Sequence, residues 1–398
     1  MRVLLIDVNC KNSSTGQIVY NLYSYLNTHG DEAAVCYGRG EAIREKNIFK
    51  FGLDWETNLH ALLTRITGYT GCFSFFSTRR LLRFIDDFQP DVVHIHELHA
   101  YFVNDTQLLS YLAKKGIKVV HTLHCEFSYT GKCGHSLKCE KWKTECGACP
   151  RVKDYPTSLF FDRTKKMFRA KKRAFEGIND LFLVTPSEWL SNRARLSFFS
   201  GRGIATIHNG IDTNVFKPTD ASALREQYGV EKERKVVLAL APHLMSRSKG
   251  GRFVLELAAK LPDVTFVMIG IDGETERMEG NTILLGPIYE KPVLAQFYSM
   301  ADLFVICSER ENYPTTCIEA QACGTPICGF DTGGTRETCI TDTDDYFVPY
   351  GDLGALKEII IRAPKKPNQI SLWLTENASS ILSNDAMAES YREIYKKG

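Results

Sequence analysis

Two glutamates in the last third of the chain have the residue type and spacing to bind a hydroxylated ligand. Glu311 and Glu319 flank Pro314 in the stretch SERENYPTTCIEAQACGTPICG. Pro314 suits the first turn of a helix, which places Glu311 in the preceding loop and Glu319 a little over one turn inside. The amides at such a helix start, around Thr315 and Thr316, can bind a diphosphate, and a nearby carboxylate can bind the two hydroxyls of a ribose. The alternative is two ordinary surface acids, because helix starts favour acidic residues.

Four cysteines lie close together in CGHSLKCEKWKTECGACP, namely Cys133, Cys139, Cys146 and Cys149, with His135 nearby. Thiols this dense predict a tetrahedral zinc site, and the final C-x-x-C is a common half-site. Two disulfides are the alternative, which a reducing compartment disfavours. A site closed by four cysteines would be structural, because catalysis needs an open coordination position. Such a site would cross-link the long insertion that follows HTLH.

Five histidines occur at the ends of two neighbouring apolar runs: His94, His96 and His99 in HIHELH, and His121 and His124 in HTLHC. Histidines in core strands are usually structural, with their ring nitrogens bonded inside the fold. The carboxyl ends of parallel strands, however, form the edge at which such sheets bind ligands. This concentration of imidazoles therefore favours a ligand-contacting histidine in the group.

The apolar runs of the chain are short, β-branched and separated by helix-length segments, as in parallel sheets covered on both faces. One series runs from VLLIDV to ATIHNG, and a second restarts near Lys235 and ends at YFVPYG. The pattern predicts an α/β chain of two doubly wound, Rossmann-like domains facing a cleft. We expect a first domain over residues 1–212, with a cysteine-rich insertion at 125–150, and a second over 213–378. Residues 379–398 would form an amphipathic helix that packs back toward the first domain.

Composition narrows the possible functions. The chain has 398 residues, of which 44% are hydrophobic and 24% charged, as in globular proteins. A net charge of +2 gives no case for nucleic acid as a partner. No stretch approaches the roughly 18 apolar residues of a transmembrane helix, and the apolar start of MRVLLIDVNC is too short for a signal sequence. We therefore expect a cytoplasmic protein.

The stretch around the two glutamates resembles the signature of family-4 glycosyltransferases, which are retaining enzymes with two Rossmann-like domains (the GT-B fold). The resemblance spans nearly the whole chain. Besides the glutamates it rests on Ala320, Ala322, Gly324, Pro326, Gly333, Gly334, Glu337, VTPSEWL (184–190) and IHNGIDTNVFKP (207–218). Within the family, TLH…TGKC, the cysteine run and ENYP are similar to bacterial exopolysaccharide and O-antigen transferases, including those of the colanic-acid cluster.

This resemblance assigns roles to the glutamates and to the cations expected near a leaving diphosphate. It implies that Glu311 lies near the donor sugar and that Glu319 binds the ribose. Lys249, which precedes two glycines in APHLMSRSKGG, matches the family's lysine and would stabilise the departing charge. The usual arginine position is His243 here, which leaves open whether His243 or Arg247 supplies a second cation.

Further ligand contacts are expected in both halves of the chain. By resemblance, His124 would contact the donor sugar near the reacting carbon, as an orienting or electrostatic group. The loop NCKNSSTGQ lacks the G-x-G-x-x-G of nicotinamide enzymes. Thr15 and Gly16 in it would let the backbone approach a diphosphate or the acceptor, with helix capping as the alternative. Substrate contacts are also expected from Asn312, Tyr313, Pro314, Thr315 and Thr316.

Together these features predict a retaining hexosyltransferase of bacterial surface polysaccharide or lipopolysaccharide biosynthesis. It would move a sugar from a UDP- or GDP-linked donor to a glycan or polyprenyl-diphosphate-linked acceptor. Since no side-chain nucleophile stands out, we expect front-face attack by the acceptor hydroxyl, with no cofactor required for catalysis. Two rivals remain: a nucleotide-sugar epimerase or hydrolase, and a non-catalytic scaffold of a glycan assembly complex.

Two segments predict contact with a membrane surface. GCFSFFSTRRLLRFI (71–85) mixes phenylalanines with three arginines, and RTKKMFRAKKRAF (163–175) is strongly basic. Such elements suit the anionic lipid of an inner membrane or a polyprenyl-diphosphate-linked acceptor, so peripheral membrane contact is expected. The alternative is a solvated basic helix over an ordinary core.

Overall fold

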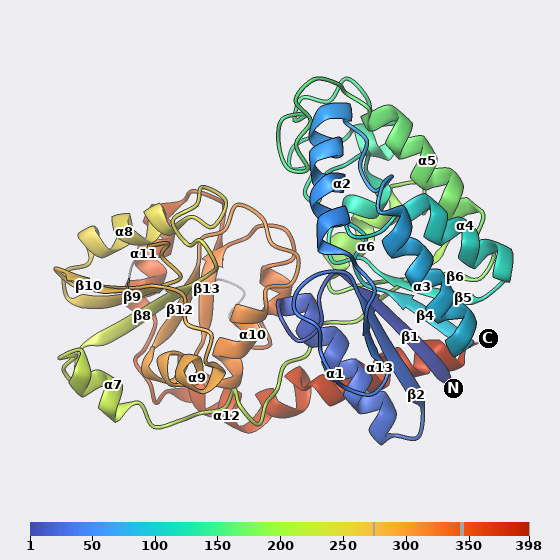
Figure 1. Ribbon diagram of the computed structural model, residues 1–398. Coiled ribbons are helices and arrows are strands. Elements are labelled where there is room, and N and C mark those ends of the chain that lie inside the picture. The colour runs from blue at the N-terminus through green and yellow to red at the C-terminus, as the bar shows by residue number, and fades with distance from the viewer. Residues whose placement is uncertain (274, 343–345, 398) are drawn as a thin grey trace. The chain divides into compact units, whose positions relative to one another are not determined.

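The computed structural model describes residues 1–273, 275–342 and 346–397, so Gly398, the last residue of the expected C-terminal segment, lies outside it. The chain divides into two compact units (Figure 1). The first contains Met1–His208 together with Ala388–Gly398, and the second contains Asn209–Met387. Each unit is an α/β structure built on its own sheet, as the apolar runs predict.

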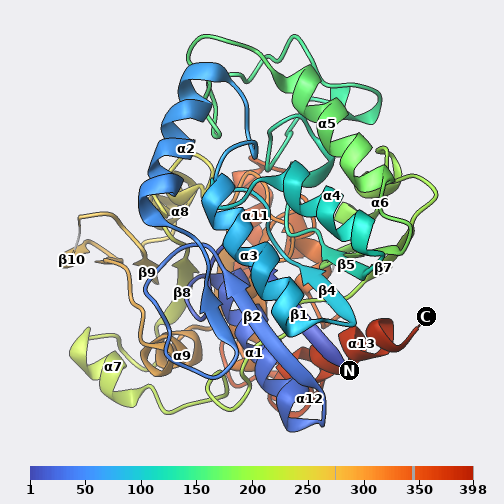
Figure 2. The same cartoon turned by 45° about the vertical axis from the view of Figure 1, so that its right-hand side comes forward.

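The first unit contains a parallel sheet of seven strands in the order β3-β2-β1-β4-β5-β6-β7. Its strands are β1 (Arg2–Asp7), β2 (Glu32–Tyr37), β3 (Ile48–Lys50), β4 (Val92–Ile95), β5 (Lys118–Thr122), β6 (Leu181–Thr185) and β7 (Gly203–Thr206). Its helices are α1 (Ser14–Thr28), α2 (Asp54–Thr67), α3 (Phe75–Phe88), α4 (Asp105–Lys115), α5 (Thr164–Glu176), α6 (Glu188–Arg195) and α13 (Asn384–Lys396). Helices α3 and α4 lie side by side along this sheet (Figure 2).

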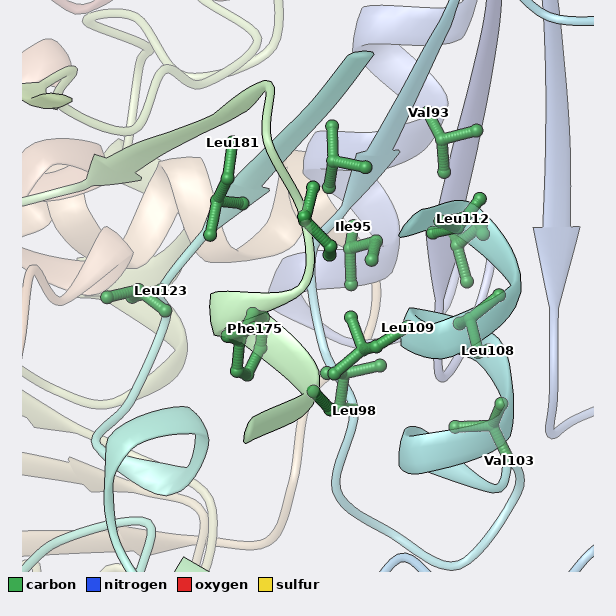
Figure 3. Close-up of a cluster of buried hydrophobic side chains, with 14 of the residues drawn as sticks. Val93, Ile95, Leu98, Val103, Leu108, Leu109, Leu112, Leu123, Phe175 and Leu181 are labelled. Atoms are coloured by element: carbon green, nitrogen blue, oxygen red, sulfur yellow. The ribbon is translucent and has the colours of Figure 1, made fainter. Parts of the chain in front are cut away.

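Buried aliphatic side chains hold the helices of the first unit onto the sheet. Val93 and Ile95 of β4 belong to one apolar cluster with Leu108, Leu109 and Leu112 of α4 (Figure 3). These α4 residues recur at helical spacing, which directs one face of the helix to the core. Burying each such side chain contributes roughly 1.5–3 kcal/mol. This packing fixes β4, and so the polar residues that follow it.

The C-terminal helix α13 completes the first unit. Its residues Tyr391 and Tyr395 are 1% and 3% exposed. The Tyr395 hydroxyl lies 2.6 Å from His94 Nδ1, and the Tyr391 hydroxyl lies 3.0 Å from Thr122 Oγ1. Lys118 Nζ donates to backbone carbonyls at the end of the helix. The apolar stripe read from the sequence is therefore buried against β4 and β5.

The second unit contains a sheet in the order β10-β11-β9-β8-β12-β13-β14, parallel except for the edge strand β10. Its strands are β8 (Lys235–Leu240), β9 (Val264–Ile269), β10 (Glu276–Glu279), β11 (Thr282–Leu285), β12 (Leu303–Ile306), β13 (Ile327–Phe330) and β14 (Phe347–Val348). Its helices are α7 (Ser222–Gln227), α8 (Gly251–Lys260), α9 (Lys291–Met300), α10 (Thr315–Ala322), α11 (Leu353–Arg362) and α12 (Gln369–Leu382). Both units thus present the carboxyl ends of parallel strands, where doubly wound sheets bind ligands.

Candidate active site

An ion pair joins two of the residues predicted to be catalytic. Lys249 Nζ lies 2.6 Å from Glu311 Oε1, and the two side chains are 30% and 18% exposed. Lys249 precedes α8, and Glu311 follows β12. Gly250 allows the two segments to approach each other closely. Its φ is +75°, and a Cβ added there would lie 2.2 Å from the Cys307 carbonyl oxygen. The structure therefore places a cation and a carboxylate side by side after two adjacent strands.

The glycine pair of the predicted signature lies against the backbone of Glu311. Gly333 forms a parallel β-bridge with Glu311, and the Gly334 amide donates to the Glu311 carbonyl over 3.1 Å. The φ of Gly333 is +64°, and a Cβ there would lie 1.9 Å from that carbonyl oxygen. Only a residue without a Cβ fits, so the glycine fixes the position from which the Glu311 side chain starts.

Glu319, predicted to bind a ribose, lies half-buried on α10. Burial raises its pKa, while a hydrogen bond from the Tyr298 hydroxyl to Oε2, 2.8 Å long, acts in the opposite direction. Tyr298 itself is fully buried on α9. Sequence reasoning missed this tyrosine, because nothing in the spacing of α9 ties it to the glutamate. Tyr298 holds one carboxylate oxygen, and a hydrogen bond from the Thr315 side chain also stabilises this carboxylate.

The start of α10 matches the predicted anion site in its backbone. Pro314 precedes the helix, and no side chain in the described part of the chain caps it. Thr315 and Thr316 are half-buried in the first turn, whereas Asn312 and Tyr313 are buried. The Tyr313 carbonyl accepts a hydrogen bond from the Asn209 side chain. The helix start thus has uncapped amide donors, the arrangement that binds anions in other proteins.

The two candidates for a second cation differ in their surroundings. His243 has a φ of +52°, and its Nδ1 lies 2.7 Å from Asp272 Oδ1. Both side chains are largely exposed, at 73% and 61%. Arg247 is also exposed and lies on the same loop as Lys249. Between the two, Arg247 keeps a permanent charge near Lys249, whereas His243 is engaged with an aspartate.

The five histidines of the first unit divide into two that are bonded within the core and three that follow the strand ends. His94 bonds Tyr395 and Thr122, and His121 bonds the Ile95 carbonyl and Ser128, so both rings are satisfied inside the fold. The remaining three follow the carboxyl ends of β4 and β5. The core interpretation is therefore confirmed for His94 and His121.

His124 and His96 form a pair at this edge, with Nε2 of His124 3.1 Å from Nδ1 of His96. Burial, together with His121 and His99 nearby, lowers the pKa of His124 to about 3. Its imidazole is therefore neutral at physiological pH. A neutral ring can orient a hydroxyl through a hydrogen bond but supplies no positive charge.

Two buried carboxyl groups lie near these histidines and were not singled out from the sequence. Asp7 ends β1 and is fully buried. Glu97 follows β4, and its Oε2 lies 3.1 Å from His99 Nε2. Burial raises the pKa of both carboxyls to about 8, with Glu97 adding to the shift of Asp7. The sequence signal that could have identified them is the acidic residue after each apolar run, in LLID and in HIHE.

The loop after β1 shows the helix cap that the sequence left as an alternative. Ser13 caps α1, since its Oγ accepts the amide of Gly16 over 3.2 Å. Gly16 is buried, and a Cβ there would lie 3.2 Å from the backbone of Asn9. Thr15 is half-buried beside it. The Gly16 amide is thus engaged within the protein, and the Thr15 hydroxyl lies 3.4 Å from the Ser13 hydroxyl.

The four clustered cysteines lie between β5 and α5, where Cys133, Cys139, Cys146 and Cys149 line one small cavity. All 13 cysteines of the chain are free thiols in the structure. His135, which the sequence places nearby, does not line this cavity.

Comparison with known families agrees with this geometry. Residues 15–215 match Glycosyltransferase Family 4, and residues 234–365 match Glycosyl transferases group 1. The chain belongs to glycosyltransferase family 4. The first match covers most of the first unit, and the second covers β8 to α11, which include Lys249, Glu311 and Glu319.

Similar proteins include the colanic acid biosynthesis glycosyl transferase WcaC of Escherichia coli (strain K12). It is 28% identical to this chain over 257 residues, which are 62% of each chain. The chain spans about half the length of further curated relatives. Sucrose-phosphate synthase from Thermosynechococcus elongatus has a TM-score of 0.70 at 17% identity, covering 100% of this chain and 98% of that one. Anabaena HepE, solved with UDP-glucose, has a TM-score of 0.66 at 17% identity, covering 99% of both. The likeness to these solved structures shows that this chain has the GT-B fold.

Proposed function

We propose that this chain transfers a sugar from a nucleoside-diphosphate donor to a growing bacterial surface glycan, with retention of the anomeric configuration. The observation that carries the proposal is the Lys249–Glu311 pair, 2.6 Å apart, in the unit that also holds Glu319 on the uncapped helix α10. Family membership and the WcaC likeness support the reaction class, and the UDP-glucose complex of HepE supports a uridine nucleotide as donor.

Such a site would accelerate transfer by stabilising the negative charge that develops on the leaving group. When the bond from the anomeric carbon to the diphosphate oxygen breaks, negative charge grows on the diphosphate. Lys249 and the first amides of α10 supply fixed positive ends for that charge. The acceptor hydroxyl oxygen forms the new bond on the same face, and its proton passes to the departing diphosphate oxygen. No covalent enzyme intermediate is needed.

The carboxylates have separate tasks in this scheme. Glu319, oriented by Tyr298, would accept hydrogen bonds from the ribose hydroxyls. Glu311, fixed at its backbone by Gly333, would hold a hydroxyl of the donor sugar. His124 of the first unit would orient the sugar as a neutral ring, consistent with its lowered pKa.

Acceptor-dependent turnover tests the proposal. Full-length protein is incubated with UDP- and GDP-sugars, with and without a lipid extract carrying polyprenyl-diphosphate glycans, and the free nucleoside diphosphate and product anomer are measured. We expect release that depends on acceptor, retained configuration, and a loss of about 100-fold or more in Lys249→Met. Lys260→Met, an exposed lysine at the end of α8, is the matched control. Turnover without acceptor would favour an epimerase or hydrolase, and no turnover of any donor would favour the scaffold.

We also propose that the first unit binds an anionic membrane surface. Among the described residues, no helix combines the length and the hydrophobicity that a membrane span requires. Helix α2 presents one continuous apolar face to solvent: Trp55, Leu59, Leu62 and Ile66 are 55%, 43%, 51% and 41% exposed. The exposed Phe75 and Phe76 of α3 and Phe160 and Phe161 continue it, and the Trp55 and Phe76 rings lie 6.0 Å apart.

Charge favours a lipid surface over a second protein copy as the occupant. Helix α5 exposes a row of basic residues, Lys165, Lys166, Arg169, Lys172 and Arg173. Glu145 pairs with two of them and Glu176 with a third, so the row keeps a net positive charge. The other face of the helix, including Phe168 and Phe175, is buried. Of the predicted arginines in 71–85, Arg79 and Arg83 are exposed. Arg80 instead donates to the Phe51 carbonyl and is structural. Apolar insertion beside basic residues is the physics of interfacial helices.

Vesicle sedimentation tests this surface. Wild type should pellet with phosphatidylglycerol vesicles and remain unbound with phosphatidylcholine alone or in high salt. A Leu59→Glu/Leu62→Glu variant should lose binding, whereas Leu372→Glu, an apolar residue of the second unit that is 54% exposed, should retain it. Equal binding by both variants would refute the proposed face, and concentration-dependent dimerisation abolished by the α2 variant would assign the face to a second copy.

A further inference from the structure

The four clustered cysteines line a cavity of about 20 Å³ together with Trp142 and the backbone of Gly131. A cavity of this size holds one ion or one water molecule. Trp142 is only 1% exposed and belongs to the main apolar cluster of the first unit, so the cavity lies at the edge of that core. Four thiols brought around one such space from positions up to 16 residues apart in sequence point to a shared ligand.

The surrounding backbone fixes the position of the cysteine sulfurs. The Gly131 amide donates to Cys146 Sγ over 3.2 Å, which holds this sulfur at the cavity. Lys132 is buried, and its Nζ donates to the carbonyls of Arg151, Val152 and Asp154, so it holds the chain around the cysteines in place.

This segment also lacks the regular structure that would otherwise stabilise it. Residues 123–163 connect β5 to α5. The only regular elements in this segment are two three-residue 3-10 helices, Phe127–Tyr129 and Lys141–Lys143. A connection this long without secondary structure of its own is uncommon in a compact domain. Small, poorly structured segments are commonly held by disulfides or a metal. The free thiols of the structure leave the metal as the cross-link.

We propose that Cys133, Cys139, Cys146 and Cys149 bind one structural zinc ion. Four thiolates satisfy the tetrahedral preference of zinc and leave no open position, so the ion would support the fold and not the chemistry. Zinc–sulfur bonds are about 2.3 Å long, so metal binding would draw the sulfurs together around the cavity.

One other set of residues in the described part of the chain competes for a metal. The ligand atoms of Glu97, His99 and Cys125 all lie within 4.8 Å of one another, a spacing that the four clustered cysteines do not reach. The Glu97–His99 contact of 3.1 Å is accounted for as a hydrogen bond. This set offers three ligands of mixed type, whereas the cluster offers four thiolates, which zinc prefers in structural sites. The two sets make different predictions for mutants.

Metal content of the full-length protein tests the proposal. Protein expressed in zinc-supplemented medium should contain about one zinc per chain, and Cys146→Ser should lose it. Cys339→Ser, a half-buried cysteine of the second unit, and Cys125→Ser should both keep it. Loss of metal in Cys125→Ser but not in Cys146→Ser would assign the metal to the competing set and overturn the proposal. A metal-free wild type would also overturn it, as would a thiol titration of the denatured, chelator-treated protein that finds four fewer thiols than the 13 of the sequence.

If Cys146→Ser does not fold, X-ray absorption at the zinc edge of the wild-type protein tests the same proposal. Wild type should show four sulfur neighbours at about 2.3 Å. Nitrogen or oxygen neighbours in place of sulfur would contradict the tetrathiolate site. Neither readout depends on glycosyl transfer, so failure here would leave the proposed function untouched. Chelation of the ion should also raise proteolytic cleavage within 123–163, because the segment loses its cross-link.

Discussion

Replacing Gly333 by alanine tests how the site positions Glu311. At a φ of +64° an L-residue costs about 1–2 kcal/mol. The new Cβ would also lie 1.9 Å from the Glu311 carbonyl oxygen, where about 3 Å is the closest normal approach. The two backbones must therefore separate by about 1 Å, which adds about 1–3 kcal/mol of overpacking. Gly333→Ala should thus lower the free energy of unfolding by roughly 2–5 kcal/mol.

The same displacement should affect turnover more than stability alone explains. A shift of about 1 Å in a substrate-positioning group costs about 100-fold in rate. Gly229→Ala is the matched control, because Gly229 has a φ of +59° but a Cβ added there would have no atom within 4 Å. It should lose only about 1–2 kcal/mol and keep wild-type turnover. Calorimetry and acceptor-dependent release of nucleoside diphosphate measure both effects. Identical behaviour of the two variants in both assays would refute the reasoning.

Three further predictions follow from individual contacts. Tyr298→Phe removes the hydrogen bond to Glu319 and should weaken nucleotide binding about 3- to 10-fold by calorimetric titration; unchanged affinity would show that the tyrosine does not orient the acid. His124→Ala should abolish most turnover with little change in Tm, whereas His121→Ala should lower Tm, because it breaks two buried hydrogen bonds; the opposite pattern would reverse their assigned roles. Asp7, with a pKa raised to about 8, keeps its proton in the folded state between about pH 4 and 8 while the unfolded chain releases it. The free energy of unfolding should therefore fall as pH rises through this window, by up to about 1.4 kcal/mol per pH unit, and Asp7→Asn should flatten the slope in denaturant titrations; an unchanged slope would contradict the shift.

The fold was largely predictable because its signal is local. Continuous apolar runs mark buried parallel strands, and both sheets have them. The edge strand β10 escaped prediction, because all residues of Glu276–Glu279 are exposed and no apolar pattern marks it. The exposed stripe of α2 was also missed. An apolar helix face predicts burial by default, and only the structure shows that Trp55 and Leu62 lack a covering element.

The candidate site was predictable where a motif carries it and not where distant residues complete it. Glu311, Glu319 and Lys249 stand in recognisable sequence contexts, and the structure joins two of them in an ion pair. The roles of the histidines depend on partners far along the chain: His94 bonds Tyr395, 301 residues away. No local pattern encodes such a contact, so sequence reasoning found the cluster of histidines but could not sort its members.

Calorimetric titration with UDP, GDP and their sugar conjugates tests the central claim, that the second unit binds a nucleoside diphosphate through Glu319. One base should bind, and Glu319→Gln should weaken it about 10-fold or more, since a hydrogen bond to a charged group contributes about 1.5–3 kcal/mol. Glu256→Gln, an exposed acid on α8, should bind as wild type does. No binding of any nucleotide, or equal affinity in Glu319→Gln and wild type, would contradict the account.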